Sequence, residues 1–574
     1  MALQEFVTQR LLRGIVRRLN NLRIARAGRR LAGFSRPTGG QPVAFFKAST
    51  GIDDLSWNSG FHLLTSWALR LRGVPVVYFA CRAGMSRCVL GTNRDDVHQA
   101  PPCRSCIHQS ETLYAGVPSA AGTGARGAGP ASEVHWFAFD RDPDLEQAIQ
   151  NLGLNDLMAF TWDLRVGGAS AALLENRTSM SSKADAKASV GSMPLGALCL
   201  PSLRWILRRH NLKDDENTRY LWREYILSAW NVARRFAQFL ADTDPRLVVV
   251  FNGQYFPEAV ARFVARWRGI RVVTHEVGLQ PASAFFTDGE ATAYPLAIPD
   301  DFELSEQQTA RLDAYLEQRF QGRFTMAGIQ FWPRMRGLDP ALLQTAERFT
   351  QIVPIFTNVV FDTSQTHANT IFSDMFAWLD MALDVIRAHP ETLFVIRAHP
   401  DETRLRKESR ETVEEWVGKS GGDRQPNVLF ISPTEYLSSY ELIQRAKFVM
   451  VYNSTVGLEA SIMGKPVLCG GRARYTDYAT VFFPQSLESQ RRTLQECLDA
   501  KSIQLPSEFT RNARRFLYYQ LFRSSLPFED FLLPSVRPTQ AWLRAFRWDR
   551  LLQASSVEAV LRGLLDDGDF LLHE

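Results

Sequence analysis

The strongest constraint on the fold is a regular alternation of short apolar runs and helix-like stretches between residues 351 and 471. The run "FVMVY" is apolar at consecutive positions, as expected of a strand covered on both faces. A parallel sheet needs a helix between successive strands, and this region supplies one each time. The predicted strands are "QIVPIFTNVVF" (351–361), "TLFVIRAHP" (392–400), "NVLFIS" (427–432), "FVMVYNS" (448–454) and "KPVLCGG" (465–471). This pattern predicts a doubly wound α/β domain.

A less regular alternation of the same kind precedes this region. Its strand-like runs are "VAFFKAS" (43–49), "VPVVYFA" (74–80), "VHWFAF" (134–139), "RLVVVFNG" (246–253) and "IRVVTHEVG" (270–278). Glycine- and serine-rich segments at 121–129 and 179–192 are typical of a mobile loop and a linker.

From these patterns we expect the chain to divide into four parts. Residues 1–36 form a basic helix, 37–340 a Rossmann-like acceptor domain with a cysteine-containing loop, and 341–505 a Rossmann-like nucleotide-sugar domain. Residues 506–574 are aromatic-rich and helical, and we expect them to pack back on the first domain. The predicted fold class is therefore α/β, with two doubly wound domains facing a cleft.

Composition limits the partners and the compartment. The net charge of +5 over 574 residues is small, so nucleic acid is not an expected partner. With no long uncharged apolar run and no signal-like N-terminus, we expect neither a membrane span nor secretion. Seven cysteines in a chain of this length favour the reducing cytoplasm over a disulfide scaffold.

The first 36 residues are an exception to this ordinary composition. Apolar residues recur there at helical spacing, and nine arginines accompany a single acid, Glu5. A basic amphipathic helix can lie on an anionic membrane surface, here the inner face of the cell membrane. The alternative is a helix that packs on its own domain and exposes a solvated basic face.

Three small polar residues, Asn453, Ser454 and Thr455, end the fourth strand of the second region and precede a helix. Ligands of open parallel sheets bind beyond the carboxyl ends of the strands. Ser or Thr there can simply cap the helix. The same helix start can also hold a phosphate through its unpaired N–H groups. Glu459, one turn further on, could accept hydrogen bonds from a ribose.

Several motifs together resemble those of GT-B glycosyltransferases, and more narrowly the bacterial capsule polysaccharide biosynthesis family, which includes Kdo transferases. The motifs are "NSTVGLEASIMGKPVL" (453–468), "RAHP" (397–400), "LQPAS" (279–283), "TNVVFD" (357–362) and "GGRARY" (470–475). The resemblance covers best the residues from about 245 to 480.

The resemblance implies roles for individual residues. Ser454 and Thr455, with Asn453, would hold the donor phosphate, and Glu459 would contact the donor ribose. His399 would stabilise the leaving phosphate. Arg397 lies two residues before His399, on the same face of a strand, and would also stabilise the leaving phosphate.

In GT-B enzymes the first domain normally binds the acceptor, and an inverting reaction needs a base there. His275 and Glu276 end a predicted strand and are the leading candidates, with Asp288 and Asp362 in reserve. Asn252 and Gln254 end the neighbouring strand and could position a sugar. The alternative for the His–Glu pair is structural hydrogen bonding to a turn, and the related Kdo transferases act with retention, which needs no simple base.

Two patterns could bind metals. Asp140, Asp142 and Asp144 form the Asp-x-Asp spacing of metal-using transferases, although they could instead cap a helix near Leu145. The predicted transferase site uses no metal. Four cysteines, Cys81, Cys88, Cys103 and Cys106, could hold a structural zinc, but only the second pair has the usual spacing, so reduced thiols are the alternative.

These features favour a glycosyltransferase that moves a sugar from a nucleotide-activated donor to a surface glycan or glycolipid. A nucleotide-sugar epimerase of the same fold and a non-catalytic capsule assembly factor are the alternatives.

Overall fold

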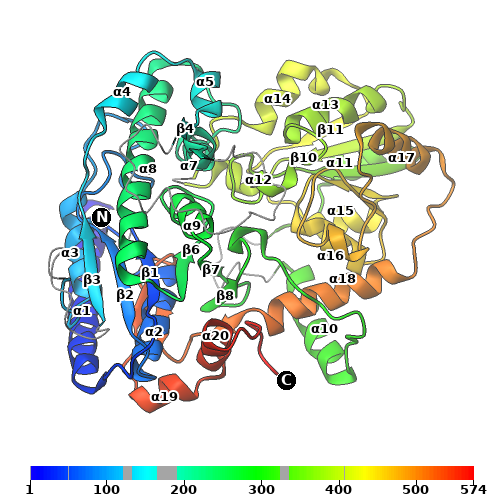
Figure 1. Ribbon diagram of the computed structural model, residues 1–574. Coiled ribbons are helices and arrows are strands. Elements are labelled where there is room, and N and C mark those ends of the chain that lie inside the picture. The colour runs from blue at the N-terminus through cyan, green and yellow to red at the C-terminus, as the bar shows by residue number, and fades with distance from the viewer. Residues whose placement is uncertain are drawn as a thin grey trace. The chain divides into compact units, whose positions relative to one another are not determined.

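A computed structural model describes residues 2–48, 51–52, 54–120, 132–163, 191–322, 335–405 and 407–574. The chain divides into two compact units (Figure 1). Unit 1 contains Met1–Ile206, Lys213–Tyr294 and Arg523–Glu574, and unit 2 contains Leu207–Leu212 and Pro295–Phe522. The loop predicted at 121–129 and residues 179–190 of the predicted linker lie outside the described residues.

Unit 1 is built on a seven-stranded sheet in the order β14-β8-β7-β6-β1-β2-β3. The five strands from β7 to β3 run parallel, and β8 and β14 complete one edge in antiparallel pairs. The strands are β1 (Val43–Lys47), β2 (Val76–Cys81), β3 (Glu133–Phe137), β6 (Leu247–Phe251), β7 (Arg271–Val277), β8 (Ser283–Thr287) and β14 (Leu526–Pro527). Two further antiparallel pairs are β4 (Trp162–Asp163) with β5 (Ser192–Met193) and β15 (Leu532–Pro534) with β16 (Ala541–Leu543).

The helices of unit 1 cover both faces of this sheet. They are α1 (Ala2–Phe34), α2 (Trp57–Leu71), α3 (Cys103–Leu113), α4 (Pro143–Ile149), α5 (Leu154–Ala159), α7 (Leu195–Leu207), α8 (Glu216–Thr243), α9 (Glu258–Trp267), α19 (Trp548–Gln553) and α20 (Ser555–Leu565). The helix predicted in the first 36 residues is present as α1.

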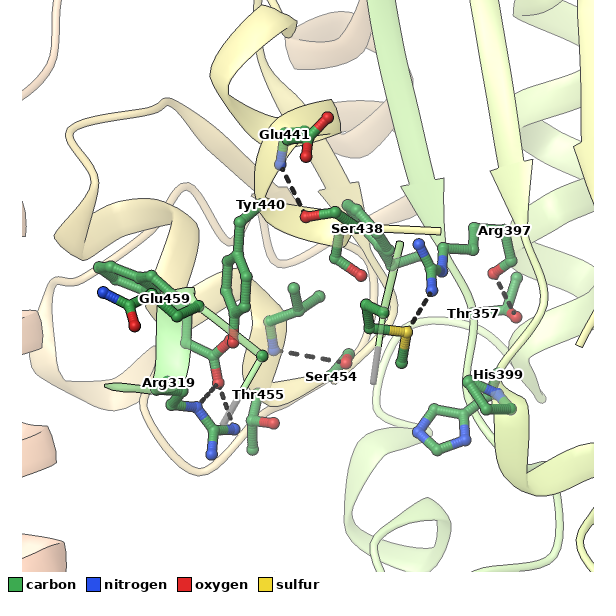
Figure 2. Close-up of a pocket in the computed structure, with 18 of the residues that line it drawn as sticks. Arg319, Thr357, Arg397, His399, Ser438, Tyr440, Glu441, Ser454, Thr455 and Glu459 are labelled. Atoms are coloured by element: carbon green, nitrogen blue, oxygen red, sulfur yellow. Dashed lines mark hydrogen bonds and ion pairs between the residues drawn. The ribbon is translucent and has the colours of Figure 1, made fainter. Parts of the chain in front are cut away.

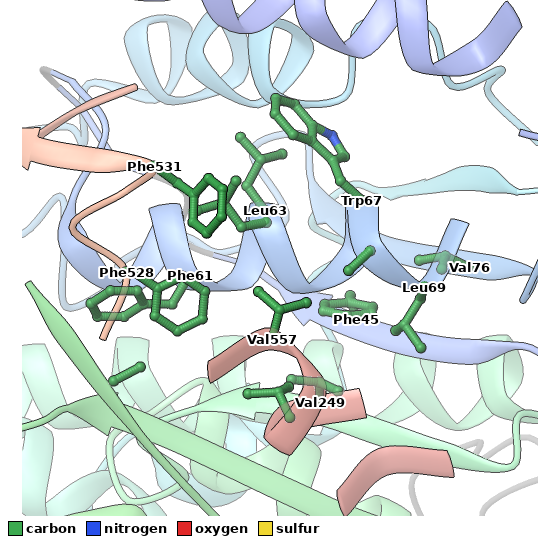
Figure 3. Packing of buried hydrophobic residues seen from close by; sticks show 14 of the residues in the cluster. Phe45, Phe61, Leu63, Trp67, Leu69, Val76, Val249, Phe528, Phe531 and Val557 are labelled. Carbon is green, nitrogen blue, oxygen red and sulfur yellow. The ribbon is translucent and has the colours of Figure 1, made fainter. Parts of the chain in front are cut away.

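The end of the chain completes the core of unit 1. Phe528 stacks against Phe61 of α2 with ring centroids 5.1 Å apart, and Val557 of α20 packs near Phe45 of β1 (Figure 3). All four side chains are at most 2% exposed. Because this core needs residues from both ends of the sequence, unit 1 closes only when the C-terminal segment returns to it.

Unit 2 is built on a five-stranded, fully parallel sheet in the order β11-β10-β9-β12-β13. Its strands are β9 (Gln351–Phe356), β10 (Thr392–Arg397), β11 (Val428–Ile431), β12 (Val449–Val451) and β13 (Val467–Cys469). Its helices are α10 (Glu306–Phe320), α11 (Pro340–Ala346), α12 (Gln365–Ala368), α13 (Met375–Ile386), α14 (Val413–Ser420), α15 (Ser439–Arg445), α16 (Thr455–Ile462), α17 (Leu487–Asp499) and α18 (Glu508–Tyr518).

The predicted α/β fold class, with two doubly wound domains, is confirmed by these topologies, although two antiparallel strands extend the sheet of unit 1. The boundaries of the units differ from the expected ones. Residues 295–340, which we assigned to the first domain, belong to unit 2, as do 506–522 of the expected tail. Residues 523–574 belong to unit 1.

None of the helices in the described ranges is both long enough and apolar enough to cross a membrane.

Candidate functional site

The strand order of unit 2 marks one position in its sheet for a ligand. From β9 the chain moves outward to β10 and β11, and then returns to place β12 and β13 on the other side of β9. The strand order therefore reverses between β9 and β12. Open α/β sheets bind ligands at the carboxyl ends of the strands at such a switch point.

A cavity of about 390 Å³ lies at this switch point (Figure 2). Its walls come from the ends of β9 and β10, the start of α16, the C-terminal end of α10, and α15. The volume is within the usual range for a small-molecule site. Among its lining residues are five of the predicted ones: Arg397, His399, Ser454, Thr455 and Glu459.

The start of helix α16 forms the middle of the cavity wall. Ser454 is the N-cap, and its Oγ accepts a hydrogen bond from the Val456 N–H at 3.4 Å. The Tyr475 hydroxyl donates to the Ser454 carbonyl oxygen at 2.5 Å and holds the cap in place. Thr455, the first residue of the helix, is exposed. The capping interpretation is thus correct, and the helix N-terminus also faces a cavity, where its partial positive charge favours an anion.

Arg397 adds a buried cation to the same cavity. It is the last residue of β10 and is only 4% exposed. Its guanidinium donates to the carbonyl oxygen of Leu437 and to Met335 Sδ at 3.8 Å. The Glu435 carboxylate offsets part of the effect of burial on the pKa of Arg397, but no ion pair between the two forms within the described part of the chain. Burial lowers the pKa of Arg397 to about 10, which still leaves it charged at neutral pH. A buried guanidinium that no carboxylate contacts directly suits an anionic ligand.

His399 lines this cavity and is half-buried. Its Nδ1 accepts a hydrogen bond from the Asp401 N–H at 3.1 Å. Burial lowers the pKa of His399, so the ring is neutral at pH 7 and carries its proton on Nε2. The ring can therefore donate one hydrogen bond from Nε2 and contributes no charge.

Glu459 is held at the far end of the cavity by two residues that the sequence did not point to. Its Oε1 accepts from Arg319 Nε of α10 at 2.7 Å, and its Oε2 accepts from the Tyr440 hydroxyl of α15 at 2.7 Å (Figure 2). Glu459 is 5% exposed. Arg319 and Tyr440 lie 140 and 19 residues from Glu459, and no local motif signals either contact.

Asn453 forms structural hydrogen bonds at the switch point. Its side-chain oxygen accepts from Gln365 Nε2 at 3.1 Å, and its backbone N–H donates to Asn358 Oδ1 at 3.3 Å. Both partners come from the segment after β9, so Asn453 ties the two sides of the switch point together. The residue is not among those that line the cavity.

Unit 1 has its own switch point, between β1 and β6. Glu276 lies near the carboxyl end of β7 at this edge. Its Oε1 accepts from Asn58 Nδ2 at 2.9 Å and its Oε2 from Asn252 Nδ2 at 3.1 Å. The Asn252 side chain in turn accepts from the Gln254 N–H at 3.1 Å. The predicted polar residues of the two neighbouring strands are therefore brought together.

His275, the other candidate base, points into the core. It is 0% exposed and lies with its ring centroid 5.2 Å from that of Phe286. Burial lowers the pKa of His275 to about 3. Its Nε2 lies 3.3 Å from Nδ1 of His62, which is also buried. Of the predicted pair, only Glu276 reaches the carboxyl edge of the sheet.

Two further charged residues flank this second switch point. Lys47 ends β1 and is 4% exposed, and Glu258 begins α9 and is 5% exposed. Burial lowers the pKa of Lys47 to about 8 and raises the pKa of Glu258 to about 7. Lys47 was not predicted from the sequence. The signal that could have identified it is a single charged residue at the end of the apolar run "VAFFK".

The reserve carboxylate Asp288 is at the wrong edge for such a role. It forms an ion pair with Arg271, the first residue of β7, at 2.7 Å. Asp288 therefore lies at the amino end of the parallel strands, away from the ligand edge.

The structure argues against both of the metal sites considered from the sequence. Asp142 caps α4 through a hydrogen bond from the Leu145 N–H at 3.1 Å, as the alternative interpretation expected. The four clustered cysteines line one small pocket. Yet in the described ranges no three His, Cys, Asp or Glu side chains are grouped so that they could hold a metal ion, so the zinc site considered at Cys81, Cys88, Cys103 and Cys106 is unsupported. Burial raises the pKa of Cys88 to about 12, which favours the protonated thiol over the thiolate that zinc needs.

A segment that contributes most of the cavity lining matches a family model. Residues 330–496 match the capsule polysaccharide biosynthesis protein family. This segment contains Arg397, His399, Ser454 and Glu459, and the match confirms the resemblance inferred from the sequence motifs. Protein FixF of Sinorhizobium fredii (strain NBRC 101917 / NGR234) is 28% identical over 242 residues, which are 41% of this chain and 50% of that protein. The chain thus aligns with about half the length of this relative.

Solved structures with a similar fold include two Kdo transferases and an epimerase. The KpsC beta Kdo 2,4 transferase of Thermosulfurimonas dismutans is 12% identical, with coverage of 49% of this chain and 80% of that chain and a TM-score of 0.32. The KpsC beta Kdo 2,7 transferase is 14% identical, with coverage of 56% and 87% and a TM-score of 0.30. The UDP-GlcNAc 2-epimerase of Neisseria meningitidis, bound to UDP-GlcNAc, is 15% identical, with coverage of 50% and 80% and a TM-score of 0.23.

Proposed function

We propose that this protein is a glycosyltransferase that moves a sugar from a nucleotide-activated donor to a growing surface glycan or glycolipid of the capsule or lipopolysaccharide type. One observation carries the proposal: the buried guanidinium of Arg397 and the N-terminus of α16 line the same cavity at the switch point of unit 2. Together they form a seat for a phosphate. The family match of residues 330–496 supports the same reading.

In this proposal the donor phosphate lies at the start of α16. The backbone N–H groups and the Thr455 hydroxyl hydrogen-bond to its oxygens, and Arg397 balances its charge. Glycosyl transfer builds negative charge on the departing phosphate, and fixed donors in a buried site stabilise that charge. His399 donates one further hydrogen bond from Nε2 to the leaving group. We propose that these groups act without a metal ion.

The ribose would lie at the far end of the cavity, near Glu459. Arg319 contacts one oxygen of this carboxylate through two nitrogens and Tyr440 donates to the other, but a carboxylate has about four acceptor sites. Glu459 can therefore hold Arg319 and Tyr440 in place and still accept a bond from a ribose hydroxyl. We propose both roles for it.

On the acceptor side, we propose that Glu276 of unit 1 accepts the proton of the attacking hydroxyl. Asn58 and Asn252 fix the orientation of its carboxylate. A base in this position would serve an inverting reaction, whereas a retaining reaction would leave Glu276 to position the acceptor.

The test is a panel of CMP-, UDP- and GDP-sugars, assayed first for thermal stabilisation of the protein and then for release of nucleotide when an acceptor glycan is added. Stabilisation followed by acceptor-dependent release is the expected result. Release should be lost in Arg397→Leu and kept in Arg387→Leu, a matched exposed arginine at the end of α13. Interconversion of the sugar without acceptor would instead identify an epimerase, and binding without release a non-catalytic factor.

A further inference from the structure

Helix α1 is fixed to unit 1 through one of its faces. Asn20 on this face is 0% exposed; its Nδ2 donates to the Ala541 carbonyl and its Oδ1 accepts from the Leu543 N–H, both at 3.0 Å. Ile24 and Leu31 are also 0% exposed on this face. The helix lies beside α3 and is held by packing as well as by hydrogen bonds (Figure 1). Its orientation on unit 1 is therefore defined.

The opposite face of α1 exposes a line of large apolar side chains. Leu12, Ile15, Leu19 and Leu22 are 51, 54, 52 and 53% exposed. Their spacing of three, four and three residues places them on a single stripe of the helix. Ten large apolar side chains are exposed among the described residues, and five of them, these four and Phe34, are on α1. Such a concentration of exposed apolar surface on one helix indicates an interaction site.

Arginines continue the same face toward the end of the helix. Arg26, Arg29 and Arg30 are exposed and lie, at helical spacing, in line with the apolar stripe. Arg18 is exposed at the edge of the stripe itself. From residue 12 to residue 34 the sequence has seven arginines and no acid. Within residues 12–34, the exposed face of α1 is thus mainly apolar up to Leu22 and strongly cationic from Arg26 to Arg30.

We propose that this face of α1 docks the protein onto an anionic phospholipid membrane, with the helix parallel to the surface. Leu12, Ile15, Leu19 and Leu22 enter the region between headgroups and acyl chains, and the arginines bind lipid phosphates. The proposal depends on the exposed surface of unit 1 and is independent of the nucleotide cavity of unit 2.

Charge complementarity selects the membrane over a second copy of the chain. In a symmetric dimer through this face, the arginines of one helix would meet either the arginines or the apolar stripe of the other. Neither supplies a counter-charge, because residues 12–34 contain no acid. Like charges at an interface without counter-charges are unfavourable. An anionic lipid surface supplies both the apolar layer and the negative charge that this face lacks.

The test is flotation of the full-length protein with vesicles of phosphatidylcholine alone and with vesicles that also contain phosphatidylglycerol. We expect binding to the anionic vesicles, reduced at high salt. The variant Leu12→Ser/Ile15→Ser/Leu19→Ser/Leu22→Ser should lose this binding. The matched control Leu405→Ser/Leu487→Ser removes two exposed leucines of unit 2 and should bind like the wild type.

A second variant keeps the test decisive if the serine substitutions disturb folding. Arg26→Gln/Arg29→Gln/Arg30→Gln changes only exposed side chains, and should lower the affinity for anionic vesicles by about a hundredfold, from the usual contribution of each basic residue near such a surface. Wild-type protein that fails to bind anionic vesicles, or variants that bind as well as the wild type, would overturn the proposal. So would a dimer in light scattering that the serine variant dissociates while vesicle binding is unchanged.

Discussion

Removal of the Glu459 carboxylate should reduce both the stability of unit 2 and its affinity for nucleotide. In the structure this carboxylate pairs with Arg319 at 2.7 Å and accepts from Tyr440 at 2.7 Å. The side chains of Arg319 and Glu459 are 17% and 6% exposed. Glu459→Ala leaves the guanidinium buried without its counter-charge, and such a change costs about 3–5 kcal/mol of the free energy of unfolding.

A double-mutant cycle isolates the pair. Arg319→Met alone should also be costly, because it leaves a buried carboxylate supported by Tyr440 alone. In Arg319→Met/Glu459→Met both charges are absent, so the loss should be clearly smaller than the sum of the two single losses. Urea denaturation measures each value. As a control, Glu496→Ala breaks an ion pair with Arg492 at 4.0 Å whose side chains are about two-thirds exposed, and it should cost under about 0.5 kcal/mol.

Calorimetry on the same variants tests the functional half of the prediction. Loss of a hydrogen bond to a charged group corresponds to about a 10- to 100-fold lower affinity for nucleotide in Glu459→Ala. The control Glu496→Ala should bind nucleotide like the wild type. Additive single losses would refute the coupling, and unchanged nucleotide affinity would remove Glu459 from the ribose role.

Two further predictions concern stability. His275 has a pKa of about 3 in the folded protein, below its unfolded value, so its contribution is complete above about pH 6.5 and is lost as the pH falls. Between pH 6.5 and 5 the wild type should lose about 2 kcal/mol more than His275→Gln in urea denaturation, and equal pH profiles would contradict this. A Cβ at Gly457 would lie 2.4 Å from the Tyr475 hydroxyl that holds Ser454, so Gly457→Ala should cost about 1–3 kcal/mol in thermal unfolding. A Cβ at Gly418 would meet no described atom within 4 Å beyond its own turn of helix, so Gly418→Ala should be neutral or stabilising by up to about 1 kcal/mol. Equal effects at both sites would refute the packing argument.

The architecture of unit 2 could be predicted because each strand carries its own signal. Apolar runs bounded by polar residues predicted all five strands, although the first was expected to extend to residue 361 and ends at Phe356. Thr357 and the residues after it leave the sheet at the ligand edge. The helix cap at Ser454 could also be predicted, because it depends only on residues that are neighbours in the sequence.

The contacts that shape the cavity could not be predicted in the same way. Arg319 reaches Glu459 from a helix 140 residues earlier, and this helix, α10, was assigned to the other domain. Only the folded chain brings the two together. The same limit explains the C-terminal segment, where Phe528 and its neighbours complete a core that they share with residues from the first half of the sequence.

The pair His275 and Glu276 shows a different limit. Alternation along a strand establishes that the two side chains point to opposite faces. It does not establish which face a helix covers. Here α2 brings His62 against His275, so the histidine is buried, while Glu276 is held by Asn58 and Asn252 at the end of the strands.

A crystal structure of the full chain with a bound nucleotide tests the central claim most directly. The account predicts a phosphate within hydrogen-bond distance of the N–H groups at the start of α16 and of the Arg397 guanidinium, with the ribose toward Glu459. A nucleotide bound elsewhere, with this cavity filled by solvent, would contradict the assignment of the site and the transferase mechanism built on it.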